Sequence, residues 1–307
     1  MKKHPPFSNQ GDRRPIHPTF GEDFVEIRKL KREEVPEVKR LCEGAHWPYT
    51  LKDIERLYHL EPNGWFSAIV NGQYVGQAMG LSIESLGCVG IVIVHQDFRR
   101  KGIATGLTKA ALDYLKEKGI KTIKLDATPE GYGIYEKLNF ISEFSVPHYV
   151  REPSSTKVSP ERIDGIEPLK ASEIDAISEF DKDYFGVNRS AVLKALRKDS
   201  DGFILKEGKK VRGYAMVKPM DYENGFWLGP WVAESMPSAE RLLEHILQHY
   251  HNKEIRLGAL ESNPYAQDLL AKYGFKVDFK ITRMRFGPKL KREDPSGIYA
   301  EAGHEKG

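Results

Sequence analysis

Three consecutive basic residues and a glycine, Arg99-Arg100-Lys101-Gly102, separate two segments of different periodicity. The preceding residues, 89–94, are apolar and predict a strand, whereas apolar residues at helical spacing between Ile103 and Leu115 predict a helix. The basic turn therefore falls at a helix N-terminus, where backbone N–H groups lack partners and the helix dipole is positive. This arrangement favours an anion, and we expect a phosphate or pyrophosphate there.

The elements that position this turn predict a mixed α+β unit. Asn71-Gly72 is a type I′ turn signal and indicates an antiparallel hairpin. Apolar periodicity predicts helices at 33–45, 51–59, 103–118 and 132–138, and strands at 65–70, 73–83, 88–94, 122–127 and from 140 onward.

The same order of elements recurs later in the chain. Three segments match in sequence, aligning Ile27 with Ile166, Gly76 with Gly213 and Phe140 with Phe275, at offsets of 139, 137 and 135 residues. A nearly constant offset indicates duplication. We therefore expect two modules, each a mixed, mostly antiparallel sheet flanked by helices. The predicted parts are an N-terminal tail (1–22), a first module (23–150), a linker (151–163), a second module (164–288) and a C-terminal tail (289–307).

Composition excludes several classes of protein. The chain has 47 basic and 44 acidic residues, so net charge indicates no nucleic-acid partner. Cys42 and Cys88 form neither a disulfide framework nor a metal-ligand pattern, and we expect no metal site. The sequence has no apolar stretch of membrane-spanning length and no signal-peptide core near the N-terminus, so we expect a cytoplasmic protein without a membrane partner. It leaves the oligomeric state open.

The basic turn resembles the pyrophosphate loop of the GNAT acetyltransferase superfamily, Gln/Arg-x-x-Gly-x-Gly/Ala, and Tyr135-Glu136-Lys137-Leu138-Asn139-Phe140 resembles the family's closing motif. The resemblance implies that acetyl-CoA is the cofactor. It implies that backbone groups of Ile93 and Val94, on a splayed strand, hold the pantetheine arm and polarise the acetyl carbonyl. It also implies that Tyr135 is the general acid for the departing thiolate. The implied pyrophosphate-binding residues are Arg99, Arg100, Lys101, Gly102, Ile103, Ala104 and Thr105.

A general base is harder to assign. Some family members carry a carboxylate on the strand near Cys88 and Val89, and this sequence has none there. Glu84 is the nearest candidate. Asp126, His95, His46 and a relay of water molecules are the alternatives.

The second module lacks the residues of the cofactor loop. With Leu242 aligned on Leu107, Glu234 replaces Arg99, Pro237 replaces Gly102 and Leu270 stands where Tyr135 stands. Proline removes an amide donor and fixes φ. We therefore assign the cofactor and the chemistry to the first module.

The second module retains many aromatic residues, which belong either to a packed core or to an acceptor pocket between the modules. The candidate acceptor-binding residues are Tyr184, Phe185, Arg189 and Trp231. The sequence thus predicts an acetyltransferase that moves an acetyl group from acetyl-CoA to an amine of a small molecule or peptide, by direct attack in a ternary complex. The alternative is a non-catalytic acyl-CoA-binding sensor whose second module recruits a partner protein.

Overall fold

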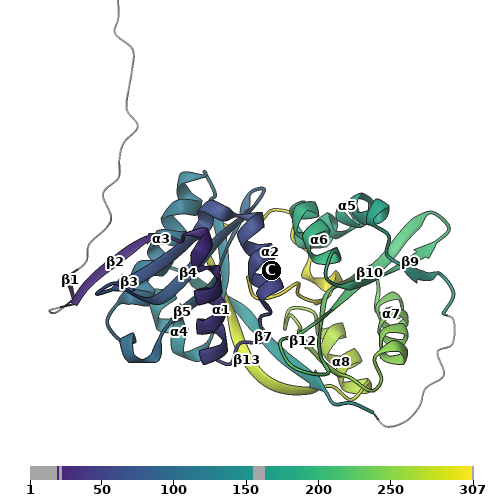
Figure 1. The fold of residues 1–307 in the computed structure, drawn as a ribbon. Coiled ribbons are helices and arrows are strands. Elements are labelled where there is room, and N and C mark those ends of the chain that lie inside the picture. Colours follow the sequence, from purple (N-terminus) through teal and green to yellow (C-terminus); the bar gives the residue numbers. More distant parts are fainter. Residues whose placement is uncertain (1–18, 21–22, 155–162, 306–307) are drawn as a thin grey trace, which may run out of the picture.

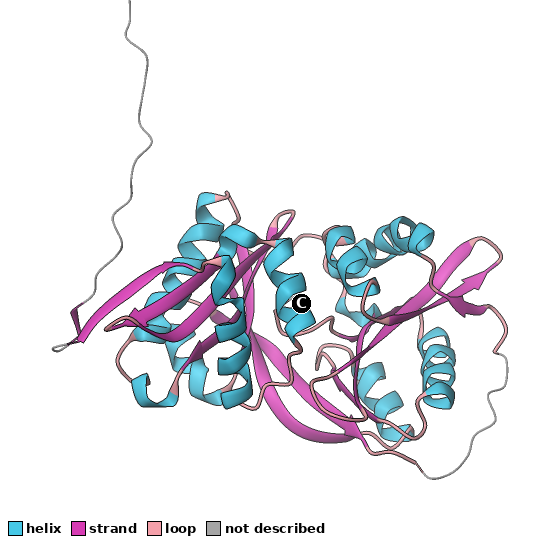
Figure 2. Cartoon of the chain, in the orientation of Figure 1, coloured by secondary structure: helices cyan, strands magenta, loops and turns pink. Residues whose placement is uncertain are grey.

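A computed structural model describes residues 19–20, 23–154 and 163–305 (Figures 1 and 2). Most of the predicted N-terminal tail at 1–22 and of the linker at 151–163 lies outside the described residues. Among the described residues, no helix combines the length and the apolar character that crossing a bilayer requires.

The two modules repeat one order of elements, which confirms the predicted α+β fold. The first module contains β1 (Thr19–Phe20), β2 (Asp23–Lys29), α1 (Val35–Gly44), α2 (Leu51–Leu60), β3 (Trp65–Val70), β4 (Gln73–Ile83), β5 (Leu86–Val94), α3 (Ile103–Glu117), β6 (Thr122–Ala127), α4 (Pro129–Lys137) and β7 (Ile141–Arg151). The second contains β8 (Ile166–Pro168), α5 (Ile174–Phe185), α6 (Ser190–Arg197), β9 (Asp201–Glu207), β10 (Lys210–Pro219), β11 (Gly225–Ala233), α7 (Met236–His249), β12 (Glu254–Gly258), α8 (Pro264–Lys272) and β13 (Lys276–Phe286), followed by β14 (Ile298–Ala300).

The α4 helix begins three residues earlier than the periodicity predicts. The Thr128 hydroxyl accepts a hydrogen bond from the Gly131 amide at 3.3 Å, and Pro129 occupies the first turn. Threonine caps a helix and proline is tolerated in its first turn, so these two residues start the helix before its apolar pattern begins.

The modules exchange their last strands. In the order β5-β6-β13-β7-β12-β11, β13 of the second module lies between β6 and β7 of the first, and β7 lies between β13 and β12. These two long strands cross the middle of the molecule in Figure 1. Only the pairs β5–β6 and β11–β12 are parallel among the described strands. Each module's sheet is therefore completed by the other module.

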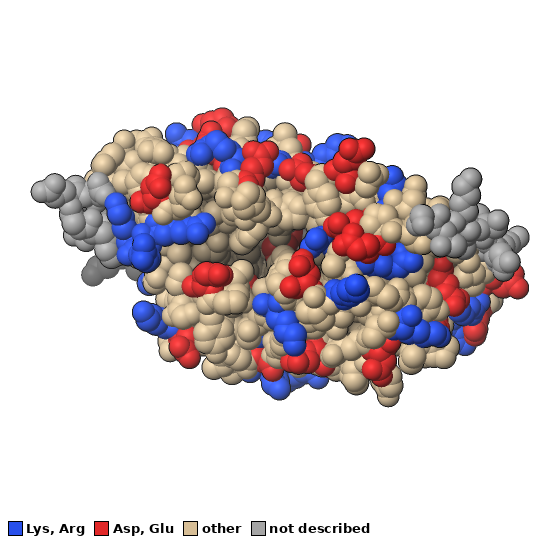
Figure 3. Space-filling model, turned by 90° about the horizontal axis from the view of Figure 1, so that it is seen from below, with Lys and Arg blue, Asp and Glu red and all other residues tan. Residues whose placement is uncertain are grey.

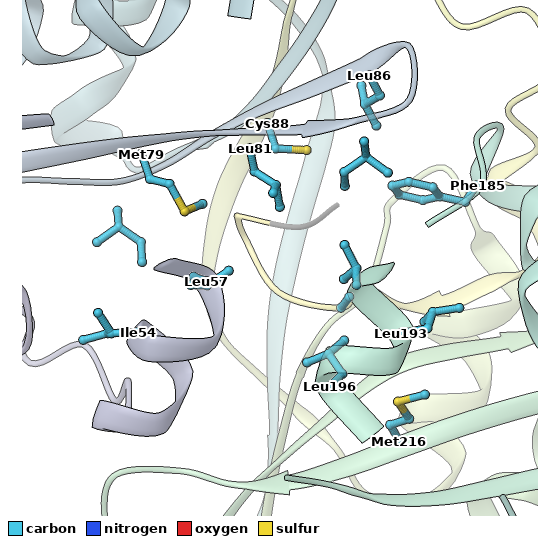
Figure 4. Packing of buried hydrophobic residues seen from close by; sticks show 14 of the residues in the cluster. Ile54, Leu57, Met79, Leu81, Leu86, Cys88, Phe185, Leu193, Leu196 and Met216 are labelled. Carbon is cyan, nitrogen blue, oxygen red and sulfur yellow. The ribbon is translucent and has the colours of Figure 1, made fainter. Parts of the chain in front are cut away.

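A shared hydrophobic core joins the modules above this sheet. One cluster combines buried residues of both modules, and Figure 4 shows α2 and β4 side chains facing those of α5, α6 and β10. The labelled members are Ile54, Leu57, Met79, Leu81, Leu86, Cys88, Phe185, Leu193, Leu196 and Met216. Burial at about 25 cal/mol per Å² of apolar surface favours a fixed arrangement of the two modules.

Buried ion pairs cross the same interface. The Asp53 carboxylate on α2 lies 2.9 Å from the Lys218 ammonium on β10, and Arg56 of α2 donates to Asp199 at 2.8 Å. Asp53 and Arg56 also pair with each other. Charged side chains removed from water require partners, so these pairs fix the facing surfaces of α2 and β10.

Candidate functional site

A cavity of about 1500 Å³ runs from the basic turn of the first module into the space between the modules. Its walls come from β5, α3, β6 and α4 of the first module, and from β10, β11, β12, β13 and the segment after β14. Figure 3 shows a hollow between the modules, near the middle of that face, with acidic side chains visible inside it. The volume exceeds that of an ordinary single-ligand pocket, which is about 300–1,000 Å³.

The basic turn forms one end of the cavity. Gly102 is the N-cap of α3 with φ 74°, and Arg100 also has a positive φ of 62°. The first backbone bond of the helix runs from Gly106 N to Gly102 O, so the amides of residues 103–105 point out of the helix end. No acidic residue lies in the first turn of α3. This end can bind an anion through backbone amides and the helix dipole.

The side chains of the turn have different positions. Arg99 and Arg100 line the cavity, and Arg99 Nε also donates to the carbonyl of Val94 at 3.1 Å. The Lys101 ammonium lies 5.4 Å from the centre of the Phe98 ring, and Lys101 is not among the lining residues. Of the predicted loop residues, the structure therefore brings Arg99, Arg100 and residues 102–105 to the cavity wall.

The strands β5 and β6 separate beside this end. They pair only from Leu86 to Cys88. The rest of β5, residues 89–94, lines the cavity and includes Ile93 and Val94. A bulge between the pairs Gln77–Ile93 and Met79–Gly90 gives Ile91 a φ of 50°. A β-branched residue rarely adopts this conformation, which costs on the order of 1–3 kcal/mol. The bulge therefore interrupts the β4–β5 ladder in the part of β5 that lines the cavity and that β6 does not pair.

Tyr135 of α4 also lines the cavity. Its ring packs edge-on against Phe140 with 6.2 Å between ring centres, and the residue is 8% exposed. Burial raises the pKa of the phenol above its ordinary value, so the hydroxyl stays protonated across the neutral range. The structure gives this hydroxyl no hydrogen-bond partner within the described chain. Tyr135 can therefore donate a hydrogen bond into the cavity.

A buried polar cluster from both modules lies beside the cavity, and its members Asp126 and His304 line the wall. Arg283 of β13 donates to Asp126 of β6 and, at 2.8 Å, to Glu301. The His304 imidazole lies 3.1 Å from Glu301 Oε1 and 3.9 Å from Asp126 Oδ2. Burial opposes its charge, but the two carboxylates raise the pKa of His304 to about 9. The cluster therefore holds two carboxylates against two cations.

Aromatic rings form the wall beside this cluster. His148 of β7 stacks on Phe279 with ring centres 4.3 Å apart, and Trp227 lies 5.7 Å from His148. Burial lowers the pKa of His148, so its imidazole is neutral. This wall can pack against the apolar part of an acceptor.

The structure corrects the prediction of Glu84 as the base. Glu84 lies in the exposed turn between β4 and β5, at the far end of β5 from the basic turn, and accepts a hydrogen bond from the Asn188 amide at 2.9 Å. It does not line the cavity. The β4–β5 turn lies next to the paired end of β5, at Leu86 to Cys88, whereas the cavity is lined by residues 89–94 farther along the strand.

The alternative bases have other positions. His95 caps a short 3-10 helix and lies off the cavity wall, whereas His46 lines the cavity and is exposed. Asp126 lines it too. Burial alone would raise the pKa of the Asp126 carboxyl, but the Arg283 guanidinium outweighs burial and holds this pKa well below the ordinary range. Asp126 is therefore a weak base, although it lines the cavity.

The predicted acceptor residues belong to the core, and that prediction is wrong. Arg189 is 1% exposed and forms two hydrogen bonds with Asp181, at 2.7 and 2.8 Å, while its guanidinium stacks 3.9 Å from the Phe185 ring. Tyr184 packs on Phe180, with 5.2 Å between ring centres. Trp231 is fully buried. None of Tyr184, Phe185, Arg189 and Trp231 lines the cavity.

The second module has a gap between β11 and β12 that corresponds to the open gap between β5 and β6, and in the second module this gap is filled. Its strands β11 and β12 pair only from Gly225 to Trp227, and β14 fills the space beyond. Ile298 O accepts a hydrogen bond from Asn263 Nδ2 at 3.0 Å, and Glu301 N donates to Gly258 O at 3.0 Å. Residues 298–301 of the chain therefore occupy the position that corresponds to the open gap between β5 and β6.

The helix that corresponds to α3 is also unsuited to an anion. The α7 helix is capped by the Ser235 hydroxyl, and Pro237 lies in its first turn. Glu234, just before the cap, pairs with Arg212. An acidic side chain and a satisfied cap leave no anion site at this helix end.

Comparisons with known proteins agree with this geometry. The GNAT acetyltransferase family model matches residues 26–140, and a second acetyltransferase (GNAT) domain model matches residues 177–300. The chain is 24% identical to holothin acyltransferase of Pseudoalteromonas sp. (strain SANK 73390), over 85% of this chain and 87% of that protein. It is 25% identical to the uncharacterized N-acetyltransferase YitH of Bacillus subtilis, over 82% and 88% of the two chains.

Solved structures show the same two-module fold. A candidate acetyltransferase from Pyrococcus horikoshii superposes with a TM-score of 0.81 at 22% identity, covering 97% of this chain and all of that one. A tandem GNAT protein from the clavulanic acid biosynthesis pathway has a TM-score of 0.59 at 15% identity, covering 86% and 99%. The chain belongs to the GNAT acetyltransferase family, with two modules in tandem. It is an enzyme of the N-acetyltransferase class.

Proposed function

We propose that the protein transfers an acetyl group from acetyl-CoA to an amine, with one acetyl-CoA site per chain, in the first module. The observation that carries the proposal is the continuous cavity, which joins an anion-binding helix end, a pair of splayed strands and a buried polar cluster. In the second module β14 fills the corresponding gap, and the helix that corresponds to α3, α7, is capped by the Ser235 hydroxyl.

The residues of the first module fit acetyl-CoA in order along the cavity. The amides of residues 102–105 and the guanidinium groups of Arg99 and Arg100 would hold the pyrophosphate. Backbone groups of β5 between Ile91 and Val94 would bind the pantetheine arm and polarise the acetyl carbonyl, as preorganised donors do for an oxyanion. Tyr135 would donate a hydrogen bond to the sulfur as negative charge develops there.

The aromatic and acidic end of the cavity would hold the acceptor. Its aromatic wall favours an apolar body and can face a cationic nitrogen, and the carboxylate of Glu305, which also lines the cavity, favours such a nitrogen. With both substrates bound in one cavity, the amine can attack the thioester directly, which requires no acetyl group on the enzyme.

Turnover with a panel of amines tests the proposal. The panel contains butylamine, benzylamine, spermidine, aniline and a lysine-containing peptide, and release of free thiol from acetyl-CoA is recorded. We expect at least one amine to be acetylated, with the product verified by mass spectrometry. Binding of acetyl-CoA without turnover of any amine would favour the acyl-CoA sensor instead.

A further inference from the structure

The segment after β14 passes from the second module into the cavity. Residues 298–301 pair with β11 and β12, and the chain then continues to His304 and Glu305, which both line the cavity. The chain thus runs from the filled gap of the second module to β5, the splayed strand of the first module.

Glu305 ends this path against β5. Its side chain is buried, with the residue 1% exposed, and Tyr49 Oη donates to Glu305 Oε2 at 2.6 Å. Gly90 lies directly beneath it: a Cβ at Gly90 would lie only 2.4 Å from Glu305 Cβ. Glycine at this position therefore permits the close approach of Glu305 to the strand.

This position is one residue before the bulge at Ile91, where β5 separates from β6. The β5 strand itself has no carboxylate, and the other buried carboxylates at this end, Asp126 and Glu301, are bound by Arg283. The Glu305 carboxylate accepts a hydrogen bond from the Tyr49 hydroxyl and lines the cavity. A buried carboxylate that lines the cavity and lies against the strand beside the splay point is placed to accept a proton from a bound amine.

We propose that Glu305 binds the acceptor ammonium and takes the proton that must leave before the nitrogen can attack, a role that rests on the proposed function. The ammonium transfers one proton to Glu305, which later passes it to solvent. The neutral nitrogen then forms the C–N bond as the C–S bond breaks. The nitrogen loses its second proton and the thiolate gains one, so each turnover yields the amide, the thiol and one released proton.

The proposal also gives the second module a function in the reaction. Its own cofactor site is lost, and β14 occupies the vacated gap with Tyr299 packed on Trp231, 5.1 Å between ring centres. Tyr49, from the loop between α1 and α2 of the first module, donates a hydrogen bond that orients the carboxylate. The base is therefore supplied by one module to the chemistry of the other.

Steady-state kinetics of the full chain with butylamine and with aniline test the proposal. Butylamine is protonated at neutral pH and aniline is not, so only butylamine requires removal of a proton before attack. We expect Glu305→Gln to lower kcat for butylamine by roughly 10²- to 10⁴-fold, and to lower it much less for aniline. Calorimetry should show that Glu305→Gln binds acetyl-CoA with the affinity of the wild type. Glu305→Asp should recover part of the rate, and Tyr49→Phe should reduce kcat several-fold. The control Glu84→Gln removes the same group from the exposed β4–β5 turn and should leave kcat unchanged.

Three outcomes overturn the proposal while leaving the proposed function intact. They are turnover of butylamine by Glu305→Gln at the wild-type rate, equal losses for both amines, and faster turnover by a chain ending at Ala302, which would make the removed residues 303–307 inhibitory. A wild-type protein that acetylates no amine would overturn both. Thermal melts of each variant show that a loss of rate is not a loss of fold, and Tyr49→Phe and Glu305→Asp decide the matter if Glu305→Gln does not fold.

Discussion

Trp231 of β11 packs on Tyr299 of β14, with 5.1 Å between their ring centres and both residues almost completely buried. The pair lies in the gap of the second module that corresponds to the open cofactor gap of the first. An inserted strand of the chain thus lies where β11 and β12 separate.

This contact predicts the effect of removing the indole. Trp231→Ala should lower the melting temperature by several degrees, because truncating a buried aromatic residue costs about 3–5 kcal/mol. Acetyl-CoA affinity should change little, since Trp231 does not line the cavity. Differential scanning calorimetry with and without acetyl-CoA measures both quantities. A specific rise in the KM for the acceptor with an unchanged melting temperature would return Trp231 to a binding role.

Tyr135→Phe removes the only group of α4 assigned to the chemistry. We expect kcat to fall by roughly 10²- to 10⁴-fold with acetyl-CoA affinity nearly unchanged, because the hydroxyl acts on the departing sulfur and the ring still packs on Phe140. Tyr132→Phe, on the same helix, is the matched control: its hydroxyl bonds to Ser142 at 2.6 Å. Equal rates for wild type and Tyr135→Phe would assign Tyr135 to packing.

The exchange of β7 and β13 predicts that the first module does not fold alone. A fragment ending at Pro153 lacks β13, so β6 and β7 lose the strand that lies between them and expose unpaired edges. We expect such a fragment to aggregate or to lack near-ultraviolet circular dichroism. Appending residues 276–288 through a flexible linker should restore a folded, acetyl-CoA-binding protein. A soluble, active fragment without this addition would show that the exchange is dispensable.

Acid should weaken the interface between the modules. Burial raises the pKa of Asp53, but Lys218 and Arg56 outweigh it and hold the pKa well below the ordinary value of 3.8. A depressed folded-state pKa stabilises the protein above the unfolded value and loses this contribution as the pH falls below about 4. Asp53→Asn should therefore cost roughly 3–5 kcal/mol at pH 7, because it leaves two cations buried, and should flatten the acid limb of stability against pH.

Urea unfolding from pH 7 to pH 3 measures this dependence. The double variant Asp53→Asn/Lys218→Met is the control, because it removes one of the uncompensated cations and should recover part of the lost stability. An acid limb of equal slope in wild type and Asp53→Asn would mean that Asp53 does not govern it.

Much of the fold was predictable because its signals are local. The duplication, the hairpin at Asn71-Gly72 and the glycine at the helix start depend on spacing and turn chemistry within short segments. The exchange of β7 and β13 was not predictable, because a strand has the same apolar pattern whichever neighbour it pairs with. The three residues of β14 are too few to show any periodicity.

The functional site divides in the same way. The anion-binding end lies within one stretch of sequence, so its composition identifies it. The acceptor end combines residues more than 200 positions apart, such as Tyr49 and Glu305, and no spacing relates them. Aromatic residues of the second module have the same sequence signature in a core as in a pocket, which is why Trp231 and Arg189 were assigned to the wrong place. Gly90 is the one local signal for Glu305, and its meaning depends on what packs against it.

The stoichiometry of acetyl-CoA binding tests the central claim, that one module binds cofactor and the other has replaced it with protein. Isothermal titration calorimetry should give one site per chain. Gly102→Val should abolish binding, because valine is strained at φ 74° and blocks the approach of a phosphate to the backbone. The matched change Pro237→Gly, at the corresponding helix of the second module, should leave both stoichiometry and affinity unchanged. Two sites per chain, or a single site that survives Gly102→Val, would contradict the account.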